Sequence, residues 1–308
     1  MSINLIVNPT VSPMGWREFN NSVNNHSIAL DGYVASATKL NTKKKVANFN
    51  HHEDCNRYAS RATCDQIRLA IHSGLFDFFR DENGEVKMDI YVNDCDEDVC
   101  LSVFLLKYGY ISGNIMNPAL NTLVNVENEL DTTAGAYPYP KDYPLLRKLA
   151  WVFAPYKIAR SNGLLRTKDK KVYEGVITDV CNRIMEYLNG NSQELPLDTR
   201  YEVLERYPDW SYVKEIGIDS RTGMFGDGVK AFVSILAERE NGNRDYVIGK
   251  MSPFIDFDLP KCLKALNDAE GAENDLWGGS NTIGGSPRVT GSKLTPEQVA
   301  EIVNKAHK

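Results

Sequence analysis

The 308-residue sequence has no apolar run close to the ~20 residues that a membrane-spanning helix needs. It also has no excess of basic residues, since 35 Lys and Arg face 41 Asp and Glu and the net charge is −6. Proteins that hold long nucleic acid through its phosphates carry a basic surface. These absences argue against a membrane protein and against a protein that binds a long duplex.

The N-terminal segment MSINLIVNPTVSP lacks the basic region that opens a secretory signal. No two of the six cysteines form a CxxC pair, and a chain of this size does not need disulfides to fold. We therefore expect reduced thiols and a cytoplasmic protein. A cysteine nucleophile is not expected, because Cys95 lies in an acidic run with no basic neighbour in sequence to activate its thiol.

The composition, with 42% hydrophobic and 25% charged residues, is that of a globular protein long enough for two domains. The expected fold class is α/β, with a layered, mostly parallel sheet domain and a second, smaller α/β domain after it. We place a metal-site domain at 1–165, a helical linker region at 166–204 and a substrate-binding domain at 205–308.

Apolar periodicity predicts strands and helices that alternate in the first part of the chain. The predicted strands are 27–33, 45–49 and 87–92, and the predicted helices are 57–79, 99–108, 145–160 and 172–187. The second part is expected to hold a hairpin of strands 229–238 and 245–251, a helix at 259–269 and a last helix with a capping box of Thr295 and Gln298. Ligands of parallel sheets bind beyond the C-terminal strand ends, so the side chains there are the first candidates for a site.

Histidine and acidic side chains follow the three predicted strands. Asp31 lies at the end of the first, and His51 and His52 follow the second, although the whole chain has only five histidines. The third precedes the acidic run 94–98. We interpret these segments as parts of one metal site, with the candidate ligands Asp31, His51, Asp94, Asp96, Asp98 and Asp131. By itself, the acidic run is better explained as a solvated turn, and the histidine pair and Asp31 favour the metal site.

Carboxylates that gather at strand ends repel one another, and their burial requires a positive charge. Carboxylate oxygens with an imidazole suit Mn²⁺, Mg²⁺ or Fe²⁺ better than a sulfur-rich zinc site does. We expect Mn²⁺ or Mg²⁺, as two ions roughly 3.5–4 Å apart, because such a pair holds the attacking and leaving oxygens of a phosphate ester.

Two further features favour an anionic ligand, although each has a plainer explanation. The glycine-rich segment 277–288 would form an anion cradle from Gly284, Gly285, Ser286 and Arg288, or its glycines would only permit tight turns. Basic residues flank the histidine pair, either as a solvated loop or as a rim that attracts a small phosphorylated ligand. They are Lys39, Lys43, Lys44, Lys45, Arg57, Arg61 and Arg68.

These motifs resemble the DHH phosphoesterases, which include RecJ-type exonucleases, oligoribonucleases, cyclic-dinucleotide phosphodiesterases and family II pyrophosphatases. Asn50-His51-His52 is similar to the DHH triplet, and the run 94–98 before an apolar helix is similar to the D-x-D-x-D strand end of the family. Asp31 stands where the family has an aspartate that bridges two metals, and 284–291 resembles its glycine-rich substrate loop.

The resemblance implies a role for each matched residue. Asp96 and Asp98 would each hold one metal, Asp31 would hold both, and His51 and Asp131 would be further ligands. His52 and Arg288 are the catalytic candidates, since both would contact the substrate phosphate. The sequence departs from the family pattern at Asn50, at Val92 or Asn93 in place of a histidine, at Ser286, and in the order of the motifs, since the acidic run follows the histidine pair.

The resulting hypothesis is a metal-dependent phosphoesterase that hydrolyses a small phosphorylated substrate with metal-activated water. The substrate would be a short oligonucleotide, a dinucleotide or a nucleotide, and a 3′–5′ exonuclease on short single strands is the next enzyme class. The alternative is a catalytically degenerate protein of the same fold that binds a nucleotide or phosphate. A structural α/β protein without ligand is the third hypothesis. The sequence does not determine the oligomeric state, and a homodimer is the assembly that we consider.

Overall fold

The computed structural model describes residues 1–308 and divides the chain into two compact units. The first unit comprises 1–132 and 144–195, and the second comprises 133–143 and 196–308. The chain is α/β, and each unit has one mixed sheet. No helix combines the length and the apolar character that crossing a membrane requires. All six cysteines are free.

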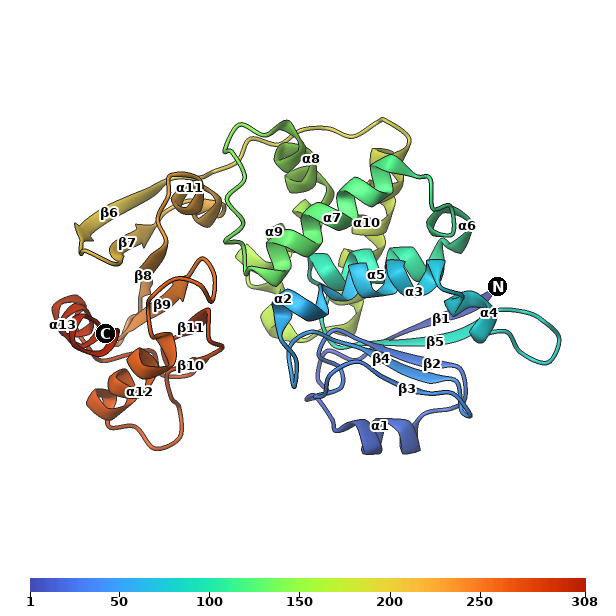
Figure 1. Ribbon diagram of the computed structural model, residues 1–308, viewed down its shortest axis with the longest axis horizontal. Coiled ribbons are helices and arrows are strands. Elements are labelled where there is room, and N and C mark those ends of the chain that lie inside the picture. Colours follow the sequence, from blue (N-terminus) through green and yellow to red (C-terminus); the bar gives the residue numbers. More distant parts are fainter. The chain divides into compact units, whose positions relative to one another are not determined.

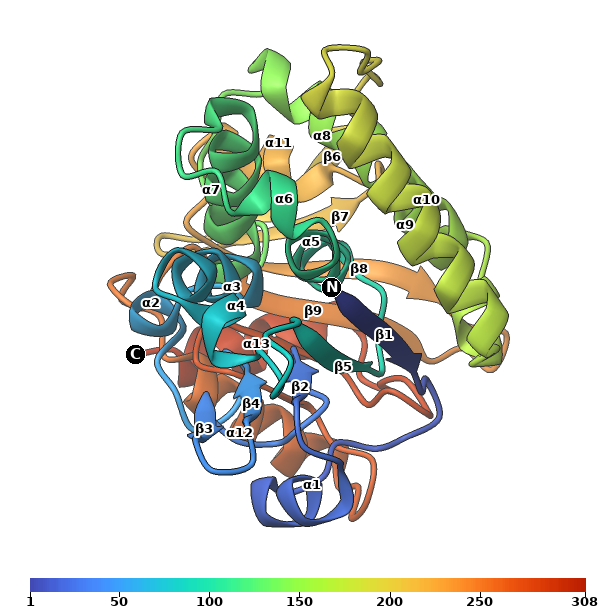
Figure 2. The ribbon, with the colours of Figure 1, turned by 90° about the vertical axis from the view of Figure 1, so that its right-hand side faces the viewer.

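The first unit is built on a five-stranded sheet with the order β1-β5-β2-β4-β3 (Figure 2). Its strands are β1 (Ser2–Val7), β2 (Ser27–Leu30), β3 (Lys39–Asn41), β4 (Val46–Phe49) and β5 (Lys87–Val92). The pairs β1–β5, β5–β2 and β2–β4 are parallel, and only the edge strand β3 is antiparallel. The carboxyl ends of β2, β4 and β5 therefore meet at one edge of the sheet.

Helices of the first unit lie on both faces of this sheet. Most of them, among them α3 and α5, lie on one face, and α1 lies on the other (Figure 1). They are α1 (Trp16–Ser22), α2 (Arg57–Ser60), α3 (Thr63–His72), α4 (Leu75–Phe78), α5 (Glu97–Lys107), α6 (Gly109–Ser112), α7 (Pro118–Thr132), α8 (Pro144–Val152), α9 (Ala154–Ser161), the 3₁₀ helix η1 (Leu164–Thr167) and α10 (Lys170–Leu188). The helix α5 is almost wholly apolar because neighbours cover it on every side, including α3, α7 and α10.

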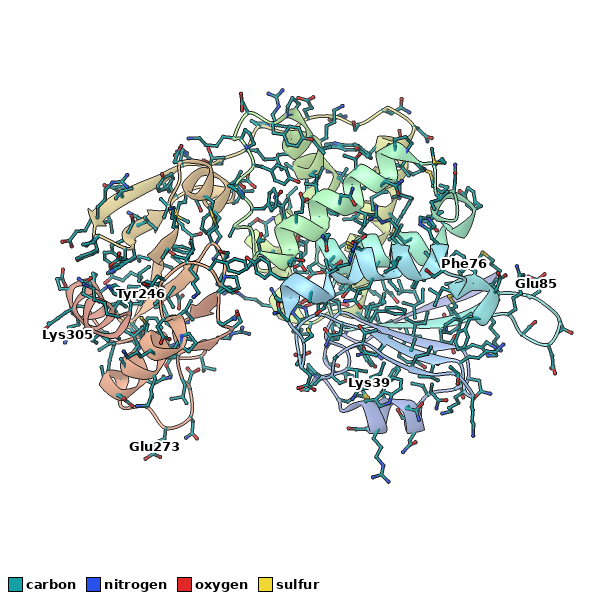
Figure 3. The ribbon with its side chains drawn as sticks, in the orientation of Figure 1. Lys39, Phe76, Glu85, Tyr246, Glu273 and Lys305 are labelled. Carbon is teal, nitrogen blue, oxygen red and sulfur yellow. The ribbon has the colours of Figure 1, made fainter.

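The second unit contains a six-stranded sheet with the order β10-β11-β9-β8-β7-β6. Its strands are β6 (Tyr201–Arg206), β7 (Ser211–Glu215), β8 (Ala231–Glu238), β9 (Arg244–Lys250), β10 (Gly278–Gly279) and β11 (Ile283–Gly285), and its helices are α11 (Ser220–Gly226), α12 (Leu259–Glu270) and α13 (Pro296–Ala306). Only β7 and β8 pair in parallel. Tyr246, labelled in Figure 3, is 1% exposed in the core between this sheet and the helices α12 and α13.

Several predicted elements agree with the structure. The hairpin of β8 and β9 turns at the expected position, and Thr295 and Gln298 form the predicted capping box of α13. The predicted helix 57–79 is wrong as one piece, because Arg61 takes a φ of 65° and Gly74 a φ of 100°, which divide it into α2, α3 and α4. The predicted helix 145–160 is likewise two helices, with Pro155 in the first turn of the second.

Other elements were not predicted. The strand β1 lies before the first predicted strand, and β3 begins at Lys39 among the basic residues that precede the second. The helix α7 was also missed. The boundaries of the units differ from the expected domains, since α10 packs against α5, α8 and α9 in the first unit, whereas the sequence suggested a linker region at 166–204.

Candidate metal centre

The polar cluster lies at the edge of the sheet where β2, β4 and β5 end. Asp31 follows β2, and His51 and His52 follow β4. Asp98 lies in the first turn of α5, and Asp131 is next to the last residue of α7. Two groups have potential ligand atoms within 4.8 Å of one another, namely Asp31 with His51 and His52, and His51 with Asp98 and Asp131. Segments up to a hundred residues apart in sequence are thus brought to one point.

The fully buried His51 is the centre of the cluster. Its Nε2 lies 2.8 Å from Asp131 Oδ2, 3.3 Å from Asp31 Oδ1 and 3.7 Å from Asp98 Oδ2. Nevertheless, neither ring nitrogen of His51 makes a hydrogen bond, and Asp131 Oδ2 makes none either. The contacts are therefore ion pairs by distance and not hydrogen bonds by geometry. Buried polar atoms without partners are rare and costly, which makes this arrangement a candidate for a bound cation.

When no metal is bound, the histidines and Asp31 stabilise the charged forms of one another. Burial alone would lower the pKa of His51, but the adjacent carboxylates of Asp131 and Asp31 outweigh burial and raise it to about 11. Burial would raise the pKa of Asp31, but His51 and His52 hold it well below its ordinary value. An imidazolium at His51 thus takes the place that a metal cation would take among the carboxylates.

Asp98 is held by backbone donors from another helix. Its Oδ2 accepts from Thr63 N–H at 2.8 Å and its Oδ1 from Cys64 N–H at 2.7 Å, so it caps the N-terminus of α3. The hydroxyl of Thr63 donates to Asp31 Oδ1 at 3.0 Å. Burial and the charges of Asp31 and Asp131 raise the pKa of Asp98 to about 7. These bonds fix the position of two carboxylates before any ligand arrives.

The donors in this cluster fit a hard divalent cation. Asp31, Asp98 and Asp131 offer carboxylate oxygens, and His51 offers an imidazole nitrogen that has no other partner. Oxygen with one imidazole is a set that suits Mn²⁺ or Mg²⁺. These atoms form two groups that share His51, one with Asp31 and His52 and one with Asp98 and Asp131. Because an imidazole nitrogen ligates one ion, two ions would need ligands beyond these groups.

Two predicted ligands take no part in either group. Asp96 is the N-cap of α5, and its Oδ1 accepts from Val99 N–H at 2.9 Å. Asp94 accepts from Cys95 N–H at 2.7 Å. Burial and the charges of neighbouring carboxylates raise the pKa of Asp96 well above its ordinary value. Both residues thus lie in the acidic surroundings of the cluster, although the structure does not bring their oxygens to the ligand positions.

Asn50, at the first position of the triplet, is a fully buried structural residue. Its Nδ2 donates to Ser36 O at 2.9 Å, to Val34 O at 3.3 Å and to Glu53 Oε2 at 2.7 Å. Its Oδ1 accepts from the N–H groups of Gly32 and His52, each at 3.1 Å. The amide therefore joins the loops that carry Asp31 and the histidine pair, and an aspartate would lack the donors for this role.

His52 lies at the border of the cluster, with a side chain that is 31% exposed. Its Nε2 is 2.9 Å from Asp31 Oδ1, and its Nδ1 is 2.5 Å from a guanidinium nitrogen of Arg57. Because a guanidinium only donates, Nδ1 accepts and the ring proton lies on Nε2, facing Asp31.

Sequence reasoning missed several residues near the cluster. Thr63 could have been noticed as a hydroxyl at the start of a helix, and Glu127 as a carboxylate one helical turn before Asp131. Burial raises the pKa of Glu127 well above its ordinary value, and the nearby charges of Glu97, Asp131 and Asp98 raise it further. The cations Lys157, Arg160 and Lys168 act in the opposite direction on this acidic region. No regular spacing in the sequence relates these three cations to the acidic region.

The glycine-rich segment belongs to the second unit, and its polar groups have partners there. Gly284 and Gly285 lie in β11 between β9 and β10. Ser286 is buried, and its hydroxyl accepts from Tyr246 N–H at 3.0 Å. The N–H groups of Val289 and Thr290 donate to Asp275 at 2.9 and 2.7 Å. These contacts favour the plainer explanation of the glycines, while the side chain of Arg288 is exposed.

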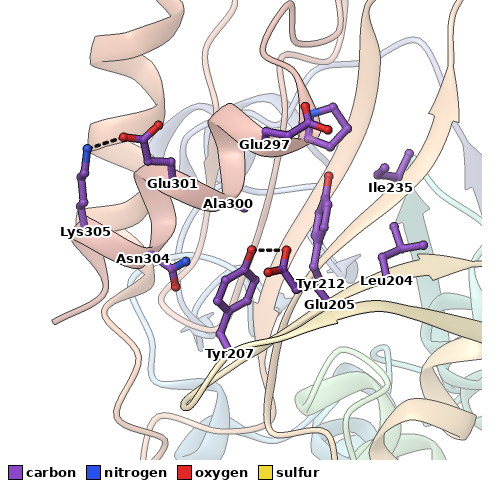
Figure 4. A pocket seen from close by; sticks show the side chains of 11 residues that line it. Leu204, Glu205, Tyr207, Tyr212, Ile235, Glu297, Ala300, Glu301, Asn304 and Lys305 are labelled. Carbon is purple, nitrogen blue, oxygen red and sulfur yellow. Dashed lines mark hydrogen bonds and ion pairs between the residues drawn. The ribbon is translucent and has the colours of Figure 1, made fainter.

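A groove of about 650 Å³ also lies in the second unit, beside α13 (Figure 4). Leu204, Tyr207 and Ile235 line its sheet side, and Glu297 and Glu301 line its helix side. None of the predicted site residues lines this groove. The groove therefore belongs to the second unit, whereas the candidate metal ligands belong to the first.

No protein-family model matches this sequence, and no curated protein is similar enough to be matched.

Proposed function

We propose that this protein is a divalent-metal-dependent phosphoesterase that hydrolyses a small phosphorylated substrate. In this proposal the first unit is a layered metal-binding domain, and the second is a smaller domain that contributes to substrate binding. The observation that carries the proposal is the cluster of Asp31, His51, Asp98 and Asp131, in which a buried imidazole without hydrogen bonds lies among three carboxylates. The motif resemblance to DHH phosphoesterases also supports it.

In this proposal, each residue has a defined role. Asp31, His51, Asp98 and Asp131 would hold Mn²⁺ or Mg²⁺, which when bound would neutralise phosphate charge and acidify a water molecule. Thr63 orients Asp31 through the hydrogen bond of 3.0 Å between them. His52 carries a proton on Nε2 beside Asp31 and would donate it to the leaving oxygen.

The decisive experiment combines metal analysis with an assay of hydrolysis. Purified protein is expected to bind Mn²⁺ and to hydrolyse bis-p-nitrophenyl phosphate or short oligonucleotides only when the metal is present. His51→Ala should lose both properties. His72→Ala is the matched control, because its Nε2 contacts Ser112 O and lies outside the cluster. Absence of metal binding in the wild type would end the proposal.

A second candidate is a protein that binds a nucleotide or phosphate without cleaving it. The observation that favours it is that Asn50 and Asp96 are both used in structural hydrogen bonds. Fewer carboxylates therefore remain for a second ion than the resemblance implies. Metal binding without turnover across a panel of phosphodiesters and nucleotides would favour this candidate.

A further inference from the structure

Arg57 is a basic residue in direct contact with the cluster. Its guanidinium lies 2.5 Å from His52 Nδ1, and His52 Nε2 lies 2.9 Å from Asp31 Oδ1. Arg57 is the first residue of the short helix α2, and its side chain is half-buried. The guanidinium, the imidazole and the carboxylate thus form one ordered chain that leads from the protein surface to the cluster.

The other basic residues near the histidine pair in sequence have different surroundings. Lys44 Nζ donates to Asn20 O and Val23 O, each at 2.6 Å, and Lys45 Nζ donates to Arg80 O. Arg61 and Arg68 both pair with Asp65 at 2.5 Å. Lys39 and Lys43 are exposed on or beside the edge strand β3, where Figure 3 labels Lys39. Among these seven basic residues near the histidine pair, Arg57 is therefore the one that contacts a residue of the cluster.

The cluster needs such a residue if its ligand is an anion. A phosphate that approaches Asp31, Asp98 and Asp131 meets three carboxylates, and His51 would be neutral once it ligates a metal. A guanidinium offers five N–H donors in a planar fork that matches phosphate oxygens. His52 Nδ1 accepts from only part of this fork, so donors remain for a ligand.

We propose that Arg57 binds the phosphate group of the ligand at this cluster and that its contact with His52 holds the guanidinium in position. The proposal rests on the proposed function, because it assigns the anion recognition of that same site. It predicts a ligand with a phosphate that reaches the rim beside His52, as a mononucleotide or the terminal phosphate of a short oligonucleotide does.

Binding of adenosine 5′-monophosphate and adenosine, measured by calorimetry with and without Mn²⁺, tests this inference. The wild type should prefer the nucleotide over the nucleoside. Arg57→Met should weaken nucleotide binding about tenfold or more and leave nucleoside binding unchanged, and Arg57→Lys should recover part of the loss. Arg61→Met is the matched control, because it removes the same charge four residues away while Arg68 still pairs with Asp65.

The outcomes separate this inference from the proposed function. If the wild type shows no preference for the nucleotide in either condition, or if Arg57→Met and Arg61→Met behave alike, Arg57 is not the phosphate-binding residue. Equal losses for nucleotide and nucleoside would also overturn the inference, since they indicate that Arg57 only supports the fold. If the protein prefers the nucleotide through Arg57 but hydrolyses no substrate, the proposed phosphoesterase function is contradicted. Arg57 then still stands as a phosphate-binding residue.

Discussion

His51 Nε2 lies 2.8 Å from Asp131 Oδ2, yet neither atom forms a hydrogen bond. The two side chains come from the end of β4 and the end of α7. This imidazole and this carboxylate lie close together without a well-oriented proton between them. Two ligands of one cation have the same arrangement. Asp31 and Asp98 approach the same nitrogen from other elements, which extends this relationship to four side chains.

The first prediction concerns metal and stability. Mn²⁺ at a hundred times its dissociation constant should stabilise the wild type by about 2.7 kcal/mol, because a ligand that binds only the native state shifts unfolding by mass action. Thermal unfolding should show this increase, and EDTA should reverse it. His51→Ala should show no response to Mn²⁺, whereas His72→Ala should respond as the wild type does. A response retained in His51→Ala would place the metal elsewhere.

The second prediction concerns Asp98 as a cap of α3. Asp98→Ala would leave the buried N–H groups of Thr63 and Cys64 without acceptors, so the metal-free protein should lose about 3 kcal/mol of unfolding free energy. Asp96→Ala removes a single N-cap hydrogen bond and should cost about 1 kcal/mol. Urea denaturation in EDTA compares the two. Equal losses would show that Asp98 does not support the fold in the way described.

The third prediction concerns pH. In the metal-free protein, burial and nearby charges raise the pKa of Asp98 to about 7, and the carboxylates of Asp131 and Asp31 raise that of His51 to about 11 against the effect of its burial. A divalent cation must displace both protons. Mn²⁺ affinity should therefore rise with pH, more steeply below about 7, where both protons are displaced, than from about 7 toward 11, where only the proton of His51 is displaced. Calorimetry in buffers of different ionisation enthalpy should detect the proton release. Affinity independent of pH would contradict this arrangement.

The sign of the accompanying stability change follows from the same shifts. The raised pKa of His51 adds stability that is fully present below its ordinary pKa of 6.5 and is lost as the pH rises toward about 11. The raised pKa of Asp98 means that the folded state holds this proton more tightly, so stability falls as the pH rises from 3.8 through about 7. Denaturation of the metal-free protein across this range measures these effects together with those of other groups with a raised pKa, such as Asp96 and Glu127, which act in the same direction.

The fourth prediction concerns Asn50. Replacing it by aspartate would restore the family triplet, and the resemblance alone would suggest a gain of activity. The structure indicates the opposite, because Asn50→Asp loses the donors to Val34, Ser36 and Glu53 and adds a charge beside Glu53. Unfolding free energy should fall by about 2–4 kcal/mol with no gain in Mn²⁺-dependent hydrolysis. The exposed Asn83→Asp serves as the control.

The sequence allowed prediction of those parts of the site that follow from local pattern. Asp31 and the histidine pair were placed correctly at strand ends, because short apolar runs followed by polar residues mark such positions. The choice among Asp94, Asp96 and Asp98 could not be made, because it depends on how α5 begins and which carboxylate points toward α3. The contact of Arg57 with His52 depends on the turn between them, where Asp54 takes a φ of 54° and Asn56 is the N-cap of α2, and no periodicity indicates this turn.

The last prediction concerns the glycine-rich segment, whose glycines are explained by packing. A Cβ on Gly279 would lie 2.2 Å from Ile283 O, whereas a Cβ on Gly278, the preceding residue of the same strand, would meet nothing within 4 Å. Gly279→Ala should therefore destabilise the protein by about 2 kcal/mol or more, and Gly278→Ala should stay within about 0.5 kcal/mol of the wild type.

Urea denaturation and nucleotide binding, measured on both variants, complete this test. If the segment serves the fold through close strand pairing, Gly279→Ala loses stability. Its nucleotide affinity, measured under conditions in which nearly all of the variant is folded, is then unchanged. If the segment is instead an anion cradle, exposed N–H groups near Gly278 would make Gly278→Ala lose nucleotide affinity without losing stability. The partners of Ser286, Val289 and Thr290 within the second unit favour the first result, because Ser286 already accepts from Tyr246 N–H and the other two N–H groups already donate to Asp275.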